Sequence, residues 1–156
     1  MFDLDIPGFG LIQLKYLVSD FTGTLSVDGS LLPGVKDQLN RIARVLEIHI
    51  ITADTFGMVQ EELKGVYCTI HILSGLDHDL QKEEYIQRIG SDKVVALGNG
   101  NNDRRMLKLA SIGVVVTEGE GCSVDALMAA NVQVRTAIEG LDLLLNPKRL
   151  KATLRF

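Results

Sequence analysis

The stretch Tyr16-Leu17-Val18-Ser19-Asp20-Phe21-Thr22-Gly23-Thr24 decides the fold, because a short apolar run ends there at an aspartate and a glycine-containing turn. Continuous apolar runs are typical of strands that are covered on both faces, as in a parallel sheet. The same form recurs at residues 48–51, 66–73, 94–97 and 112–116, and more weakly at 132–134. The chain therefore favours a parallel sheet built from these runs.

Between the apolar runs, the spacing of apolar residues changes to that of helices. Leu39, Ile42, Ala43 and Leu46 follow the i, i+3, i+4, i+7 pattern of a helix with one buried face. Looser helical patterns follow at residues 80–89, 107–110, 126–130 and 141–145. Alternating strands and helices with short connections predict an α/β fold, with a doubly wound, Rossmann-like parallel sheet and helices on both faces.

Two short hairpins are expected outside this sheet. Residues 2–6 and 11–14 alternate in polarity around Pro7-Gly8-Phe9-Gly10, which predicts an N-terminal antiparallel β-hairpin. Residues 25–32 turn at Asp28-Gly29 and predict a small flap hairpin. A length of 156 residues without a linker or repeat favours a single domain over residues 1–156.

Composition narrows the cellular setting and the partners. The net charge is −4 and the basic residues are scattered up to the tail at 148–151, so no nucleic-acid partner is expected. The two cysteines form no disulfide framework, which favours a reducing compartment. No apolar run approaches the roughly 20 residues needed to cross a bilayer. We expect a soluble, cytoplasmic protein with no membrane partner.

Ligands of open parallel sheets bind beyond the carboxyl ends of the strands, so the residues that follow each apolar run are the candidate site. Asp20 comes first, and the N–H groups of the turn behind it favour anions. A carboxylate beside a phosphate site suggests covalent catalysis through an aspartyl-phosphate. Judged on this segment alone, an aspartate that merely caps a turn is an equal alternative.

Thr52 and Lys82 follow the next two runs. The Thr52 hydroxyl stands before a helix expected to begin near Thr55, where it could donate to a phosphate oxygen, although a plain helix cap at Asp54 or Thr55 explains the segment as well. Lys82 lies just inside a helix and could neutralise Asp20 and a phosphate. Most such lysines are instead exposed partners of an acid on their own helix.

The fourth segment, Gly98-Asn99-Gly100-Asn101-Asn102-Asp103, is rich in glycine and asparagine. Its side-chain oxygens suit a hard cation such as Mg²⁺. The same residues could cap the helix that follows. Both interpretations can hold together, because a capped turn can still present oxygens to a metal.

In this order, the four segments resemble the motifs of the haloacid dehalogenase superfamily of phosphotransferases. The segment Asp-Phe-Thr-Gly-Thr-Leu at 20–25 is closer still to the signature of P-type ATPases, in which a lysine stands in place of Phe21. The resemblance spans about residues 16–116. It implies a soluble, stand-alone relative of the P-type ATPase phosphorylation domain.

The resemblance implies three sets of site residues. The catalytic set is Asp20 as nucleophile with Thr22, Thr52 and Lys82. The phosphate-binding set is Thr52 and Lys82 with N–H groups near Phe21 and Ala53. The metal set for Mg²⁺ is Asp20, the Thr22 carbonyl, Asn99 and Asp103, with Asn102 ordering the metal's water shell.

Two departures from the family pattern point to slow chemistry. Thr22 stands where the phosphatases usually carry an aspartate as general acid and base, and losing such a group typically costs about 10²–10⁴-fold in rate. Asn99 stands where a metal-binding aspartate is general, and one unit charge some 4 Å away is worth roughly 1–4 kcal/mol. We expect a slow Mg²⁺-dependent phosphohydrolase acting on a phosphorylated small molecule or nucleotide. The alternative is a catalytically weak module that binds a phospho-ligand or regulates a partner.

The segments between Asp20 and Thr52, and between Thr52 and Lys82, are too short to hold a cap domain. The site is therefore expected to be open to water and to bulky substrates. By analogy with capless members of the family, a homo-oligomer could cover it.

Overall fold

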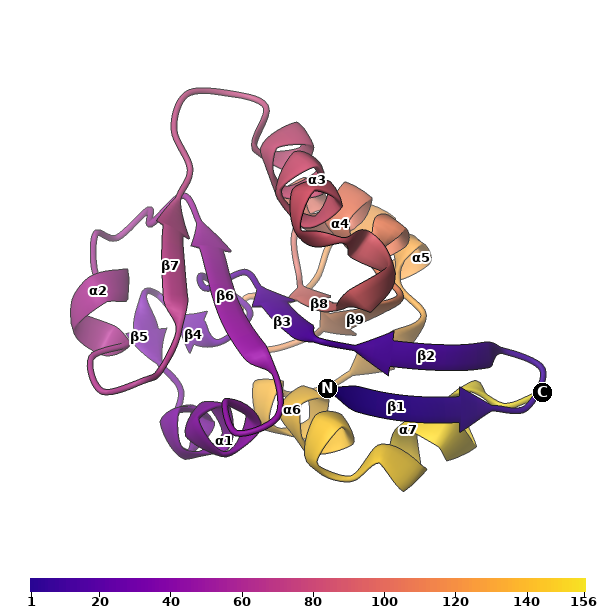
Figure 1. The fold of residues 1–156 in the computed structure, drawn as a ribbon. Coiled ribbons are helices and arrows are strands. Elements are labelled where there is room, and N and C mark those ends of the chain that lie inside the picture. The colour runs from indigo at the N-terminus through magenta and orange to yellow at the C-terminus, as the bar shows by residue number, and fades with distance from the viewer.

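A six-stranded parallel sheet forms the centre of the computed structural model, which describes all residues from 1 to 156 (Figure 1). The order of its strands is β10 (Val132–Val134), β9 (Ile112–Val116), β8 (Val94–Gly98), β3 (Tyr16–Ser19), β6 (Glu47–Thr52) and β7 (Thr69–Ile72). All neighbouring strands run parallel. β3, which is the first strand of this sheet along the chain, therefore lies between β6 and β8, where the order of the strands reverses.

Helices cover both faces of this sheet, because successive residues of a buried strand point to opposite sides. Leu17 of β3 faces the larger core together with α1 (Val35–Ile42), α6 (Ala137–Leu145) and α7 (Pro147–Leu154). Val18 faces the smaller core with α3 (His78–Ile89), α4 (Arg104–Leu109) and α5 (Val124–Ala129). Figure 1 shows the two groups of helices above and below the strands. The predicted doubly wound α/β fold is confirmed.

Both predicted hairpins are present. Strands β1 (Phe2–Ile6) and β2 (Gly10–Leu14) pair antiparallel at the N-terminus. The flap consists of β4 (Ser26–Val27) and β5 (Ser30–Leu31), and it turns at Asp28 and Gly29, whose φ angles are 51° and 82°. Positive φ at both central residues is what a tight hairpin turn requires.

The segment after β6 differs from its prediction. The helix expected near Thr55 is α2 (Val59–Glu62), which begins four residues later and has one turn. Asp54 and Gly57 have φ angles of 53° and 67°, which are left-handed and cannot belong to a right-handed helix. The strand expected over 66–73 is likewise confined to β7.

No cap domain interrupts the fold, as predicted. Only the flap and α1 lie between β3 and β6, and only α2 lies between β6 and β7. Two short 3₁₀ turns, at Ser91–Lys93 and Asn101–Asp103, flank β8. At the far end of the chain, the Phe156 N–H donates to the Pro7 carbonyl at 3.0 Å, which joins α7 to the N-terminal hairpin. No helix combines the length and the apolar character needed to cross a membrane.

Candidate active site

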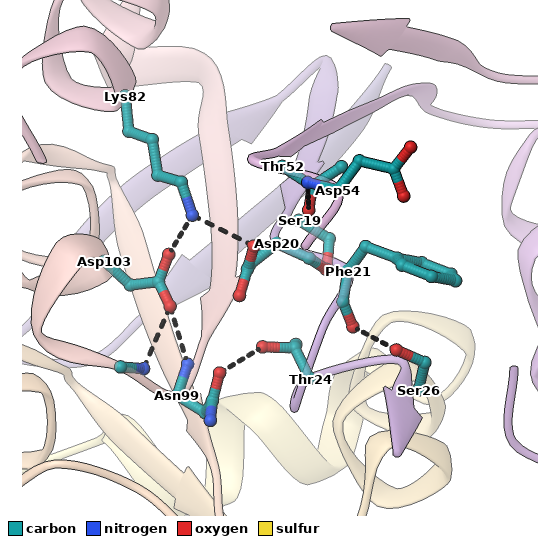
Figure 2. Close-up of polar contacts among 11 residues, drawn as sticks. Ser19, Asp20, Phe21, Thr24, Ser26, Thr52, Asp54, Lys82, Asn99 and Asp103 are labelled. Atoms are coloured by element: carbon teal, nitrogen blue, oxygen red, sulfur yellow. Dashed lines mark hydrogen bonds and ion pairs between the residues drawn. The ribbon is translucent and has the colours of Figure 1, made fainter. Parts of the chain in front are cut away.

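The loops that follow β3, β6 and β8 meet at one edge of the sheet, because these three strands are neighbours. The Asp20 N–H donates to the Leu97 carbonyl at 3.0 Å, so the first loop is tied to the strand that leads into the fourth segment. Asp20 is buried, with 6% of its surface exposed. Figure 2 shows the Lys82 side chain reaching down to Asp20 and Asp103, with Thr52 on the other side of Asp20 and Asn99 below Asp103.

Lys82 joins two of these loops through ion pairs. Its side chain is fully buried, and Nζ lies 3.0 Å from Asp20 Oδ1 and 2.7 Å from Asp103 Oδ1. The alternative partners that its own helix offered are not used, because Asp79 pairs with Arg104 and Arg105 instead. Burying an unpaired charge is costly, so the Lys82 ammonium requires both carboxylates as partners.

The buried triad shifts the pKa values of its members. The pKa of Asp20 is raised to about 7, because burial and, to a smaller extent, the negative charge of Asp103 outweigh the opposing effects of Lys82 and the Phe21 N–H. Burial would lower the pKa of Lys82, but the two carboxylates outweigh it and raise that pKa. Lys82 is therefore a permanent cation, and Asp20 is the member of the triad that exchanges a proton near neutral pH.

Both oxygens of Asp103 are engaged in contacts. Besides the ion pair with Lys82, its second oxygen accepts hydrogen bonds from the N–H groups of Asn99 at 2.9 Å and Gly100 at 3.0 Å. A Cβ on Gly98 would lie 2.5 Å from the Asp103 side chain, so only glycine fits there. The predicted role of Asp103 as a metal ligand stays a prediction, because Oδ1 keeps one lone pair beside its ion pair with Lys82. The oxygens of Asp103 fold the fourth loop and hold Lys82.

The Asn99 side chain connects three segments. Its Oδ1 accepts from the Thr24 hydroxyl at 3.1 Å, and its Nδ2 donates to the Gly121 carbonyl at 3.1 Å. The amide also packs against Gly23, where a Cβ would lie 2.5 Å from Nδ2. Asn99 thus ties the first loop to the loop between β9 and α5, and its Oδ1 retains one lone pair for a further contact.

Thr52 is the last residue of β6 and is 1% exposed. Its hydroxyl accepts a hydrogen bond from the Asp54 N–H at 3.0 Å and keeps its own proton available. Asp54 is not the predicted N-cap, because α2 begins at Val59 with Met58 as its N-cap residue, but the Asp54 Oδ1 still accepts from the N–H groups of Met58 and Val59. The Ala53 N–H donates to no backbone carbonyl.

The loop after Asp20 leaves several backbone groups free. The Phe21 carbonyl accepts from the Ser26 hydroxyl and from three N–H groups of the flap base, and the Phe21 ring is buried in the larger core. The N–H and the carbonyl of Thr22 form no backbone hydrogen bond. An anion could therefore accept from this N–H, and a cation could approach this carbonyl.

A magnesium ion fits this set of donors. No cluster of three or more His, Cys, Asp or Glu side chains is arranged to hold a metal ion. What the edge of the sheet offers is the second Asp20 oxygen, which takes no hydrogen bond from a side chain, the free Thr22 carbonyl and the Asn99 amide oxygen. Mg²⁺ is commonly bound by one or two carboxylates while it keeps several waters and shares substrate phosphate oxygens.

Three residues have contacts in the site that the sequence did not predict: Thr24 and Gly98, which lie within the predicted segments, and Ser26, which lies outside them. Thr24 and Ser26 are fully buried hydroxyl residues close in sequence to the expected nucleophile. Two hydroxyl residues at the base of a predicted hairpin are the sequence pattern that could have indicated their part in the site. Asn102 was predicted, and it lies half-buried in the 3₁₀ turn, but no hydrogen bond joins its side chain to Lys82 or Asp20.

The sequence comparisons give one relative and no family model. No protein-family model matches the chain. The uncharacterized protein MJ0073 of Methanocaldococcus jannaschii is 41% identical over 73 residues, which are 47% of this chain and 78% of that protein.

Solved structures share the whole fold at low identity. A cobalt-bound deoxy-D-mannose-octulosonate 8-phosphate phosphatase of Haemophilus influenzae superposes with a TM-score of 0.72 at 11% identity, covering 92% of this chain and 94% of that one. The corresponding Moraxella catarrhalis phosphatase, in complex with magnesium, phosphate and the KDO sugar, gives a TM-score of 0.65 at 20% identity over 91% and 94%.

A Legionella pneumophila protein assigned to subfamily III A of the haloacid dehalogenase superfamily gives a TM-score of 0.69 at 20% identity over 90% and 87% of the two chains. At these identities the likeness shows the fold. This chain has a haloacid dehalogenase-like fold without a large cap, and it belongs to the same family as the protein MJ0073 of Methanocaldococcus jannaschii.

Proposed function

We propose that this protein is a Mg²⁺-dependent phosphohydrolase that forms an aspartyl-phosphate on Asp20. The observation that carries the proposal is the buried Asp20–Lys82–Asp103 triad at the carboxyl edge of the sheet, in which one Asp20 oxygen takes no hydrogen bond from a side chain. A carboxylate with one oxygen fixed by a cation and the other free is positioned to attack. The fold and the metals named for its structural neighbours agree with this chemistry.

In the first step, the free Asp20 oxygen attacks the phosphorus atom. A P–O bond forms on Asp20, and the bond to the leaving group breaks with its electron pair. The Lys82 ammonium, the Thr52 hydroxyl and the N–H groups of Thr22 and Ala53 bind the transferring oxygens as their charge shifts. Because the free Asp20 oxygen is the attacking atom, bound Mg²⁺ would be held by the Thr22 carbonyl, the Asn99 amide oxygen and the remaining lone pair of Asp20 Oδ1, and it would neutralise phosphate charge in the same place.

In the second step, water attacks the phosphorus of the acyl phosphate and releases Asp20. Thr22 cannot serve as a base for this water near pH 7, and it cannot protonate the leaving group in the first step. The covalent intermediate is therefore long-lived, as in P-type ATPases, and substrates with good leaving groups are preferred. Acyl phosphates, aryl phosphates and nucleoside triphosphates are substrates with such leaving groups.

The fixed flap fits an open site. The Asp28 N–H donates to Glu120 at 3.1 Å, and the Leu31 N–H donates to Glu62 at 2.9 Å, so loops on both sides hold the hairpin. With no cap above it, Asp20 is reached from solvent without domain closure. Discrimination among substrates then rests on the leaving group and on the few residues of the rim.

The test is a Mg²⁺-dependent screen against phosphorylated metabolites, aryl phosphates and ATP, with Asp20→Asn purified in parallel. Mass spectrometry of acid-quenched protein should find one phosphoryl group, on the peptide that contains Asp20. Turnover that survives in Asp20→Asn, or a phosphoryl group elsewhere, would contradict the proposal.

The second candidate is a phospho-ligand-binding or regulatory module, and the internal bonds of Asn99 favour it. If no substrate turns over, binding of inorganic phosphate with Mg²⁺ should still raise the melting temperature of the wild type. The Lys82→Met variant, which lacks the cation of the site, should show no such increase.

A further inference from the structure

A cavity of about 700 Å³ opens at the amino end of the sheet, away from the candidate active site. Its wall includes Glu47 and Ile48, the first two residues of β6, together with residues between α1 and β6 and residues that lead into β7. Thr52 ends the same strand, so roughly 13 Å of strand separates it from Ile48. Small-molecule sites typically have volumes of about 300–1,000 Å³. The cavity is therefore large enough for a ligand that does not reach Asp20.

Apolar residues form one part of the wall, among them Ala43, Val45, Leu46 and Tyr67. Val45 is 47% exposed and Tyr67 is 84% exposed, so neither side chain is used in the core. An aromatic ring gains both apolar contact and a favourable ring–ring arrangement when it packs against another ring. This part of the wall suits a ligand with a flat aromatic body.

The charged residues of the wall leave one cation unbalanced. Lys15 Nζ lies 3.6 Å from Glu47 Oε1, so these two charges offset each other. Arg44 also lines the cavity; it is exposed, and its guanidinium takes part in none of the ion pairs of the chain. A guanidinium binds a carboxylate through two parallel hydrogen bonds. One free cation matches a ligand that carries a single negative charge.

His49 gives the wall a neutral hydrogen-bond donor. Burial lowers the pKa of His49, so its ring is neutral at pH 7. Its Nδ1 lies 2.8 Å from the Tyr85 hydroxyl oxygen. Tyr85 is 9% exposed and its hydroxyl forms no other hydrogen bond, so the phenol donates to Nδ1 and the ring proton stays on Nε2. Thr69 lies opposite His49 in the pairing of β6 with β7, and its exposed hydroxyl can donate beside this N–H.

We propose that this cavity binds an aromatic carboxylate, with its carboxylate on Arg44 and its ring against Tyr67. The His49 N–H and the Thr69 hydroxyl supply further donors for the carboxylate oxygens. A dianion such as a phosphate ester is matched less well, because one free cation leaves part of its charge in place. The inference does not depend on the phosphoryl chemistry proposed for Asp20.

The first test titrates the full chain with 2-naphthoate, an aromatic carboxylate, and follows the backbone amides by two-dimensional NMR. The shifts should saturate with a dissociation constant below about 1 mM, and they should gather at residues 43–49 and 67–69. The neutral 2-naphthamide has the same ring without the charge and should bind at least about tenfold more weakly.

The second test uses substitutions at exposed positions, where the fold is not at risk. Arg44→Gln should weaken binding of 2-naphthoate at least about tenfold. Arg41→Gln is its matched control, because Arg41 is also exposed but bonds to Gln38 and does not line the cavity. Val45→Asp places an acid in the wall and should abolish binding, whereas Val124→Asp, at a position that is 72% exposed on α5, should leave it unchanged.

A dissociation constant of 2-naphthoate above about 1 mM would overturn the proposal. So would equal affinities for 2-naphthoate and 2-naphthamide, or an affinity that Arg44→Gln leaves unchanged, since either result removes the carboxylate from Arg44. Shifts that gather in the loops after β3, β6 and β8 would place the probe at the candidate active site and would likewise contradict a separate site at the amino end of the sheet.

Discussion

The loops after β3 and β8 each place a carboxylate against Lys82, but the two carboxylates, Asp20 and Asp103, differ in the other contacts they make. Asp103 spends both oxygens on Lys82 and on two backbone amides of its own loop. Asp20 gives one oxygen to Lys82 and keeps the other, and its pKa is raised to about 7. The oxygen of Asp20 that no side chain contacts marks the group that can react, whereas both oxygens of Asp103 are used to hold Lys82 and the loop in place.

The largest contrast should appear in catalysis. Asp20→Asn replaces the attacking oxygen with a poor nucleophile, so we expect Mg²⁺-dependent turnover to fall by at least about 10³-fold. Circular dichroism should show an intact fold. The comparison breaks if Asp103→Asn, in folded protein, loses more activity than Asp20→Asn in the same assay.

Thr22→Asp should sharpen the role of the first loop. A carboxylate two residues after Asp20 would activate water, so breakdown of the phosphoenzyme should accelerate by about 10²-fold. A rapid-quench assay with an aryl phosphate measures this. The wild type should release a burst that approaches one equivalent per site before slow turnover, whereas Thr22→Asn, of the same size, should keep the burst. A wild type without a burst would contradict slow dephosphorylation.

For stability, in contrast to catalysis, we expect the substitution at Asp103 to have a larger effect than the substitution at Asp20. Asp103→Asn removes the charge beside a buried lysine and one acceptor of the loop, so the free energy of unfolding should fall by about 3 kcal/mol. Asp79→Asn is a suitable control, because Asp79 also forms ion pairs, with Arg104 and Arg105, but at the surface. Its loss should cost no more than about 1 kcal/mol in a urea titration. Equal losses of unfolding free energy in Asp103→Asn and Asp79→Asn would contradict the greater importance of the buried ion pair.

We expect the protonation of Asp20 to contribute to the pH dependence of the free energy of unfolding. The folded pKa of Asp20, about 7, lies above the unfolded value near 3.9, so the folded protein holds the extra proton between these values. The free energy of unfolding should therefore decrease as pH rises through this range without metal, with an upper limit of about 1.4 kcal/mol for each pH unit. Asp20→Asn should flatten this slope in denaturant titrations with EDTA. An unchanged slope would assign it to other groups.

The smallest effect is expected at Asn99. Asn99→Asp adds a charge where the donors for Mg²⁺ gather, so calorimetric titration should show about tenfold tighter binding. Asn101→Asp adds the same charge at an exposed position of the same loop and should leave the affinity nearly unchanged. Equal affinities in Asn99→Asp and wild type would mean that Asn99 only ties Thr24 to Gly121.

The sequence by itself determined the sheet, its flanking hairpins and the place of the site. Apolar runs such as residues 112–116 coincide with strands because both faces of a parallel strand are buried, and that demand is written in consecutive residues. The end of β3 brings Asp20 to the carboxyl edge by the same logic. Local turn chemistry at Asp28-Gly29 also sufficed for the flap.

Only the tertiary structure decided how the polar groups of the site divide their bonds. Lys82 had an acid available on its own helix, yet it is buried between Asp20 and Asp103, and Asn99 turns toward Thr24 and Gly121. These partners are distant in sequence, and a carboxylate or amide pattern does not specify which donor it will meet. Hydrogen bonds are assigned by the packed fold, because every buried polar group must find a partner among those that packing brings near.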